Sequence, residues 1–227
     1  MSRVGVLIVG YGRMGRLVES LAPDAGIDVT GRVDIDNADR PAEWPAADVA
    51  IDFSTGSAVP GNARHLARRG THLVIGTTGW QDQEAALRAE LAAFPIGVVS
   101  APNFALGVNL FVAVAARAAE LFANRPEFGA WIHELHHGTK KDAPSGTAIG
   151  ISDAMKAAGY SSPIDVASTR AGSIPGTHTV GFDGPGDTIT LTHTARDRSG
   201  FARGALEAAK WVNGRRGWFS MRDVLGL

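Results

Sequence analysis

The sequence predicts an α/β protein of two domains, and the order of its apolar runs is the main reason. In the first hundred residues, short apolar runs alternate with helical stretches, which predicts a parallel sheet covered by helices on both faces. These strand-like runs are residues 3–9, 28–33, 48–53, 72–75 and 96–99. Later in the chain, runs at 164–169, 177–182 and 187–195 follow one another without a helix between them. This change predicts a second, α+β domain with an open mixed sheet.

The remaining elements follow from residue spacing. Helical spacing of small and apolar residues predicts helices at 57–69, 84–93, 106–122 and 144–158 and over residues 202–212, and a further strand is expected at 130–135. Pro144 is expected near the first turn of its helix, a favourable place for proline. In 187–195, threonines alternate with Ile189, Leu191 and His193, so one face of that strand is rich in threonine.

Composition excludes several classes of function. The 227 residues include no cysteine, which excludes disulfides, thiolate metal sites and a cysteine nucleophile. The net charge is -1 and no long run of like charge occurs, so neither nucleic acid nor a membrane is an expected partner. The first residues lack the regions of a signal peptide, and a cytoplasmic location is expected. The 28 glycines exceed the roughly 16 expected from average usage of about 7%.

A glycine-rich motif follows the first predicted strand. Residues 10–15 read Gly-Tyr-Gly-Arg-Met-Gly, a G-x-G-x-x-G pattern that lies between a strand and a helix. Such a loop lets the backbone approach a pyrophosphate, and the helix amides then bind it. Asp34 ends the second strand, about 20 residues further on, where a carboxylate can bind the adenosine ribose. The first domain is therefore predicted to be a Rossmann-like dinucleotide-binding domain.

The choice between NADH and NADPH depends on the charges around Asp34. This carboxylate would repel a 2′-phosphate, and the next residue, Ile35, is not basic. Arg13, Arg16 and Arg32 could compensate. We expect NADH to be favoured and NADPH to be accepted as well.

A second cluster of reactive residues lies in segment 134–148, Glu-Leu-His-His-Gly-Thr-Lys-Lys-Asp-Ala-Pro-Ser-Gly-Thr-Ala. No metal is expected, because consecutive histidines on a strand point to opposite faces. The segment suits anion binding and proton transfer instead. Amides of Ser145, Gly146 and Thr147 would begin a helix, where a carboxylate is stabilised. Lys140 and His136 could exchange a proton with a reduced product. The competing interpretation is a capped helix beside a solvated basic loop.

This segment closely resembles the signature of the bacterial 4-hydroxy-tetrahydrodipicolinate (dihydrodipicolinate) reductase family, and the resemblance covers nearly the whole chain. Further matching motifs are Gly-Arg-Met-Gly at 12–15, Asp-Phe-Ser at 52–54, Gly-Thr-Thr-Gly at 76–79, Ala-Pro-Asn-Phe at 101–104, Arg-Ala-Gly at 170–172, His-Thr at 178–179 and Met-Arg-Asp-Val-Leu at 221–225. The resemblance implies an NAD(P)H-dependent oxidoreductase of lysine and diaminopimelate biosynthesis. The implied reaction is loss of water, hydride transfer and protonation to tetrahydrodipicolinate.

The resemblance also implies roles for individual residues. His136 and Lys140 are the proton-transfer candidates, with Lys140 favoured as the donor. The substrate, a small dicarboxylate, would be bound by His137, Lys140, Ser145, Gly146 and Thr147. Residues implied to bind the cofactor are Gly10, Tyr11, Gly12, Arg13, Met14, Gly15, Asp34, Phe53, Gly76, Thr77, Thr78, Ala101, Pro102, Asn103 and Phe104.

In this family the C-terminal helix completes the first domain. The implied division is a dinucleotide-binding domain of residues 1–105 and 199–227, and a substrate-binding and oligomerisation domain of residues 106–198. A homotetramer joined through the second domain's sheet is also implied, although the threonine-rich face could equally be solvated. The segment between Asp34 and Asp48 is shorter than in many members, which leaves the adenosine pocket open to question. Two alternatives remain: a related dehydrogenase of another amino or imino acid, and a non-catalytic sensor of NAD(H).

Overall fold

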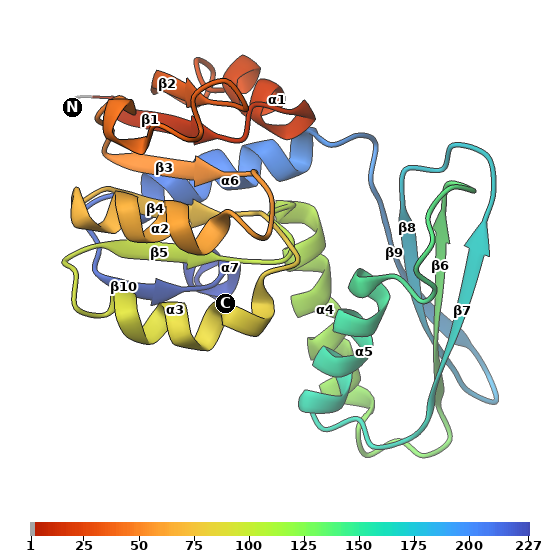
Figure 1. The fold of residues 1–227 in the computed structure, drawn as a ribbon. Coiled ribbons are helices and arrows are strands. Elements are labelled where there is room, and N and C mark those ends of the chain that lie inside the picture. The colour runs from red at the N-terminus through yellow and green to blue at the C-terminus, as the bar shows by residue number, and fades with distance from the viewer. Residues whose placement is uncertain (1–2) are drawn as a thin grey trace. The chain divides into compact units, whose positions relative to one another are not determined.

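The computed structural model describes residues 3–227, and Met1 and Ser2, which begin the predicted N-terminal segment, lie outside the described residues. The chain forms two compact units (Figure 1). One contains the chain up to Leu106 together with Ser199–Leu227, and the other is Gly107–Arg198. Among the described residues, no helix combines the length and apolar character needed to cross a membrane.

The first unit is a six-stranded sheet in which every pairing is parallel. Its order is β10-β5-β4-β3-β1-β2, formed by β1 (Val4–Val9), β2 (Ile27–Val33), β3 (Val49–Asp52), β4 (His72–Ile75), β5 (Gly97–Ser100) and β10 (Gly217–Phe219). Strands β1, β3 and β4 carry buried residues on both faces, as their apolar runs predict. The sheet therefore needs a helical layer on each side.

Helices supply those two layers (Figure 1). One apolar core gathers around α1 (Arg13–Leu21), α6 (Ser199–Val212) and α7 (Met221–Leu225), and a second gathers around α2 (Val59–Arg68) and α3 (Glu84–Leu91). Short 3₁₀ turns lie at Pro41–Glu43 and Gln81–Gln83. The first β-α-β crossover leads outward from β1 to β2, and the chain then returns to β3 on the other side of β1. Ligands of open α/β sheets bind at such a reversal, beyond the carboxyl ends of the strands.

The second unit is a four-stranded mixed sheet with helices on one face. Its order is β7-β6-β8-β9, formed by β6 (Gly129–His136), β7 (Ile164–Arg170), β8 (Thr177–Asp183) and β9 (Thr188–Thr194). β6 pairs with β7 in parallel, whereas β6–β8 and β8–β9 are antiparallel. Ile132, Val180 and Phe182 pack against α4 (Leu106–Phe122) and α5 (Gly146–Ala157). The structure thus confirms the predicted fold class of both parts.

Details differ from the sequence prediction where local signals were weak. The short edge strand β10 was not predicted, because its three residues are too few to show a period. Helix α2 begins at Val59 rather than at residue 57. The helix predicted at 144–158 begins later, because Ser145 is the N-cap of α5 and Gly146 its first helical residue, which leaves Pro144 just before the first turn. The Ser145 hydroxyl accepts the amide of Ala148 at 3.2 Å, which explains why the helix begins there.

Two helical glycines provide a matched test of this packing. A Cβ at Gly204 in α6 would lie 1.7 Å from the carbonyl oxygen of Phe104, whereas a Cβ at Gly61 in α2 would contact nothing within 4 Å. We therefore expect Gly204→Ala to lower the free energy of unfolding by about 1–3 kcal/mol or more through overpacking. Gly61→Ala should raise it by up to about 1 kcal/mol through helix propensity. Urea unfolding of both variants checks this; equal effects would contradict the close approach of α6 to Phe104.

Candidate active site

The candidate cofactor residues of the first unit follow the last residues of its parallel strands. Gly10 follows β1, Asp34 follows β2, Phe53 follows β3, Gly76 follows β4 and Ala101 follows β5. Because the strands are parallel, these positions lie along one edge of the sheet. The structure thereby brings together segments that are far apart in the sequence.

The glycine-rich loop leaves the space that a dinucleotide needs. A Cβ at Gly10 would lie 2.5 Å from the backbone of Phe53, and one at Gly15 would lie 2.3 Å from the carbonyl oxygen of Gly10. These two glycines therefore permit the tight turn and the close packing of α1 on β1. A Cβ at Gly12, the N-cap of α1, would contact nothing within 4 Å. The first turn of α1 contains no acidic residue, so its amides face open space without a competing anion.

Phe53 joins the loops that follow β3, β4 and β5. A Cβ added at Gly76 would lie 2.2 Å from Cε1 of the Phe53 ring, so only glycine fits there. The Phe53 ring also packs edge-on to the buried Phe104, at a centroid distance of 6.4 Å. Beneath it, the buried carboxylate of Asp52 accepts hydrogen bonds from Ser54 and from the Thr77 hydroxyl, the latter at 2.8 Å. This packing fixes the predicted nicotinamide loops to one another. The hydroxyl of Thr77 already has a protein partner, because it donates to Asp52.

Three charged or polar side chains meet beside the glycine-rich loop. Glu19 of α1 accepts from the Arg32 guanidinium, with Nε–Oε1 at 2.7 Å, and also from the hydroxyl of Tyr11. The Arg32 guanidinium lies 5.2 Å from the centroid of the Tyr11 ring. The bond from Arg32 lowers the pKa of Glu19. Asp34, by contrast, is exposed, and its Oδ1 atom accepts only a local bond, from the amide of Ile35.

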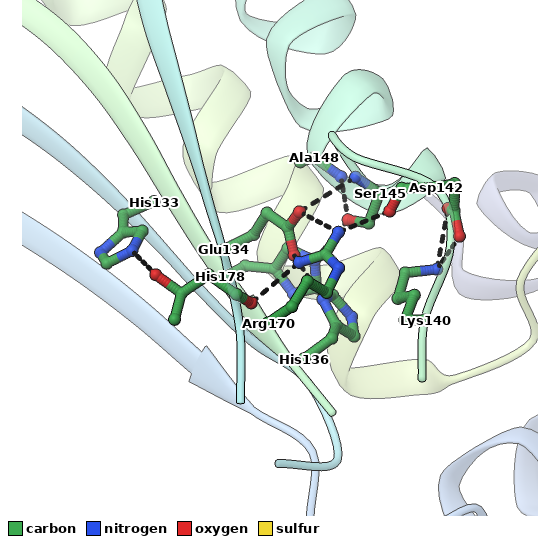
Figure 2. Close-up of polar contacts among 10 residues, drawn as sticks. His133, Glu134, His136, Lys140, Asp142, Ser145, Ala148, Arg170 and His178 are labelled. Atoms are coloured by element: carbon green, nitrogen blue, oxygen red, sulfur yellow. Dashed lines mark hydrogen bonds and ion pairs between the residues drawn. The ribbon is translucent and has the colours of Figure 1, made fainter. Parts of the chain in front are cut away.

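In the second unit, Glu134 is the centre of the candidate site (Figure 2). Its side chain is fully buried on the helix-facing side of β6. Arg170, the last residue of β7, binds it in a two-pronged pair, with Nη2–Oε1 at 2.7 Å and Nη1–Oε2 at 2.9 Å. Oε1 also accepts the amide of Ser145 at 3.2 Å, and Oε2 contacts Nδ1 of His136. Glu134 thus joins β6, β7 and the beginning of α5.

The carboxylate remains ionised in this buried position. Burial by itself raises the pKa of Glu134, but hydrogen bonds from Arg170, Ser168 and His136 outweigh that effect and lower the pKa to about 2. A buried charge of this kind requires a paired cation and further donors, and Glu134 has both.

Ser145 and His178 form the adjoining buried contact. Oγ of Ser145 lies 3.1 Å from Nε2 of His178, in addition to capping α5. Burial lowers the pKa of His178 to about 4, so this imidazole is neutral near pH 7. Ser145 is 2% exposed, and both its amide and its hydroxyl have protein partners. The amide and hydroxyl of Ser145 thus hold the beginning of α5 against β6 and β8. Gly146 is exposed and Thr147 is half-buried.

Lys140 lies in the loop between β6 and α5 and is partly exposed. Its Nζ atom binds both carboxylate oxygens of Asp142, at 2.7 and 2.8 Å, and this pairing lowers the pKa of Asp142. The exposed fractions of the two side chains are 23% and 57%, so this ion pair is accessible to solvent. Nδ1 of His137 binds the hydroxyl of Thr139 at 2.7 Å. These residues, unlike Glu134, can reach a ligand.

Glu134, His136 and His178 have ligand atoms within 4.8 Å of one another, a separation that could suit a metal ion. The chemistry of the set does not favour one. The guanidinium of Arg170 already binds both oxygens of Glu134 and would repel a cation. The cluster therefore favours a hydrogen-bonded network over a metal site.

Sequence reasoning did not include Glu134, Arg170, Asp142 or His178 among the candidate site residues. Their types carried no signal, because a buried carboxylate and a surface one look the same in a sequence. The motifs containing them, Glu-Leu-His and Arg-Ala-Gly, were the available sign, since both contribute to the resemblance.

Comparisons with known proteins identify the family of the chain. The family model for the dihydrodipicolinate reductase N-terminus matches residues 4–104, and that for the C-terminus matches residues 107–225. Named 4-hydroxy-tetrahydrodipicolinate reductases from Thiobacillus denitrificans and Myxococcus xanthus are each 39% identical. The first alignment covers 99% of both chains, and the second covers 92% of this chain and 84% of its relative.

A solved structure has the same fold. The dipicolinate-bound dihydrodipicolinate reductase from Paenisporosarcina sp. TG-14 superposes with a TM-score of 0.81 at 23% identity, covering 96% of this chain and 97% of that one. With both family models matched over nearly all of its length, the chain belongs to the dihydrodipicolinate reductase family of NAD(P)H-dependent oxidoreductases.

Proposed function

We propose that this protein reduces 4-hydroxy-tetrahydrodipicolinate to tetrahydrodipicolinate with NAD(P)H, the reduction step of lysine and diaminopimelate biosynthesis. The observation that carries the proposal is the set of polar groups that segment 134–147 brings together. Within a few residues it combines an anchored histidine, a partly exposed lysine and the amino end of α5. A cyclic dicarboxylate needs cations and helix amides for its two charges, and a reduced ring needs a proton.

The chain's own residues divide this work. The beginning of α5, at Ser145, Gly146 and Thr147, and the ammonium of Lys140 would bind substrate carboxylates, and His137 would contact the ring. In the bound state Lys140 exchanges Asp142 for the substrate and is placed to donate the proton. His136 is the second group that moves a proton. The bound dinucleotide supplies the hydride.

The dinucleotide would lie along the carboxyl edge of the first sheet. The amides at residues 10–15 would bind the pyrophosphate, with Tyr11, Arg13 and Met14 around it, and Asp34 would bind the ribose. The loops at 76–78 and 101–104, packed on Phe53, would form the nicotinamide site. Support comes from the open space at Gly12 and the packed loops around Phe53.

A preference for NADH follows from where the nearby arginine is bound. Arg32 could in principle bind a 2′-phosphate, but its guanidinium is paired with Glu19 and stacked over Tyr11. Asp34 remains exposed at the end of β2, where it would repel that phosphate. The charges of this site therefore favour the cofactor that lacks the phosphate, while NADPH is accepted with lower affinity.

The second unit would also form a homotetramer, in the cytoplasm, through the face of its sheet that carries no helix. On that face Trp131 lies directly over Gly181, and Thr188, Thr190, Thr192 and Thr194 are exposed. This flat surface can pack against a second copy. Light scattering should give about four times the chain mass of 23.7 kDa, and Gly181→Leu, which displaces Trp131, should shift it toward smaller species. A monomeric wild-type protein would contradict the tetramer.

The activity is tested by coupling a synthase that generates fresh hydroxy-tetrahydrodipicolinate to oxidation of NADH or NADPH. We expect turnover with both cofactors. Lys140→Ala should lower kcat by roughly 10²–10⁴-fold, because proton donation is lost, and leave the Kd for NADH unchanged. Lys141→Ala, at the exposed neighbouring lysine, is the control. Absence of turnover with either cofactor would refute the function, and turnover of another imino acid would favour the related dehydrogenase.

Cofactor preference is tested by two carboxylate variants in the first unit. Asp34→Ala should weaken NADH more than NADPH, because only the unphosphorylated ribose needs that carboxylate. Glu19→Gln should strengthen NADPH several-fold relative to NADH by releasing Arg32. The control is Glu90→Gln, which removes the same charge from an exposed pair with Arg64 on the opposite helical layer. Fluorescence titration gives each Kd; unchanged ratios in both variants would remove these residues from the adenosine site.

A further inference from the structure

The buried carboxylate of Glu134 is surrounded by hydrogen-bond donors. An ionised carboxylate has about four acceptor positions and no proton to donate. Arg170 fills one position on each oxygen, and the amide of Ser145 fills a second position on Oε1. Oε2 also contacts Nδ1 of His136. Since the pKa of Glu134 is about 2, none of these contacts can be a bond donated by the carboxyl group.

This arrangement determines which nitrogen of His136 carries the proton. Nδ1 must be the donor, because its partner can only accept. A neutral imidazole carries one proton, so the Nε2 atom of neutral His136 holds a lone pair. Nε2 lies toward Gly176, where a Cβ would be 3.1 Å away, so the absence of a side chain keeps this atom uncrowded. The side chain of His136 is 12% exposed, so a ligand can reach the ring.

The neighbours of His136 do not supply a competing partner. The ring of His178 meets it edge-on at a centroid distance of 5.2 Å, and that imidazole is neutral near pH 7. The guanidinium of Arg170 binds the carboxylate of Glu134 and not the imidazole of His136. Glu134 is therefore the group in direct contact with His136 that can select a tautomer.

We infer that Glu134, held ionised by Arg170 and the Ser145 amide, is the positioning residue that fixes His136 as the Nδ1–H tautomer and makes Nε2 the atom through which His136 exchanges protons with the substrate. Glu134 itself is buried and does not contact substrate. A carboxylate that orients a catalytic imidazole is a recurring arrangement, and losing it leaves the wrong tautomer in place. The inference rests on the proposed function for its kinetic part, while the tautomer is a property of the protein alone.

The tautomer can be measured directly in the full-length protein labelled with 15N in its histidine rings. In the wild-type protein, the 15N shifts of His136 should show a protonated Nδ1 and a bare Nε2 near neutral pH. In Glu134→Gln, whose amide can also donate to Nδ1, both tautomers should appear. His133 directly precedes Glu134, lies on the opposite face of β6 and is hydrogen-bonded to Thr169. It is the internal reference, and its 15N shifts should not change. A wild-type His136 protonated at Nε2 would overturn the inference at once.

Kinetics then separates positioning from structure. Glu134→Gln should lower kcat by roughly 10²-fold or more, the scale of a lost proton transfer, and leave the Kd for NADH unchanged. Glu127→Gln, an exposed residue in the same unit, makes the matched charge change and should behave as wild type. A folded Glu134→Gln protein with both tautomers and full kcat would overturn the positioning role. So would one that loses kcat while keeping the wild-type tautomer.

A second variant guards against simple misfolding. Glu134→Gln leaves the partly buried charge of Arg170 without its partner, which can destabilise a protein. In the double variant Glu134→Gln/Arg170→Met both charges are absent, and the fold should be restored. The double variant should still show mixed tautomers and low kcat. If instead the wild-type protein shows the expected tautomer but never reduces hydroxy-tetrahydrodipicolinate, the proposed function fails and the assignment of the His136 proton stands.

Discussion

The second unit is organised around one buried charge, the carboxylate of Glu134. Its donors come from β6, β7 and the beginning of α5, so a single side chain connects two strands and a helix. Burying a carboxylate is costly unless a cation and further donors surround it. Meeting that requirement places Arg170 at the end of β7 and Ser145 at the N-cap. The reactive loop between β6 and α5 is thereby held at both of its ends.

In the first unit the corresponding constraint is topological. Parallel strands all present their carboxyl ends at the same edge, and the chain reverses direction across β1. The topology alone therefore brings loops that follow five different strands to one edge of the sheet. Glycines are required where these loops cross: Gly10 against the Phe53 backbone, and Gly76 against the Phe53 ring. Much of the glycine excess in this unit reflects close packing, and the open space at Gly12 is a separate use of the same residue.

The sequence was sufficient for the fold and for the region of the site, but not for its internal order. Strands such as β4 and helices such as α4 were predicted with their observed bounds, because their apolar runs are long or bounded by clear breakers. The strand β10 was too short to detect. His136 and Lys140 were found from their types and spacing. The partners that determine their state could not be found in this way, since Glu134 and Arg170 are 36 residues apart and meet only through the pairing of β6 with β7.

The two units use buried carboxylates for different ends, and the donors reveal the difference. Asp52 accepts hydrogen bonds only from neutral groups, on Ser54, Asn62 and Thr77. Its role is to connect the loops that carry these groups. Glu134 is paired with a guanidinium and kept far from protonation. A neutral set of donors would fix the loops equally well, but it would let a buried acid take up a proton more readily. Such an acid could donate to His136 and reverse its tautomer. The arginine is therefore needed because the neighbour of this carboxylate is a histidine whose proton must stay in place.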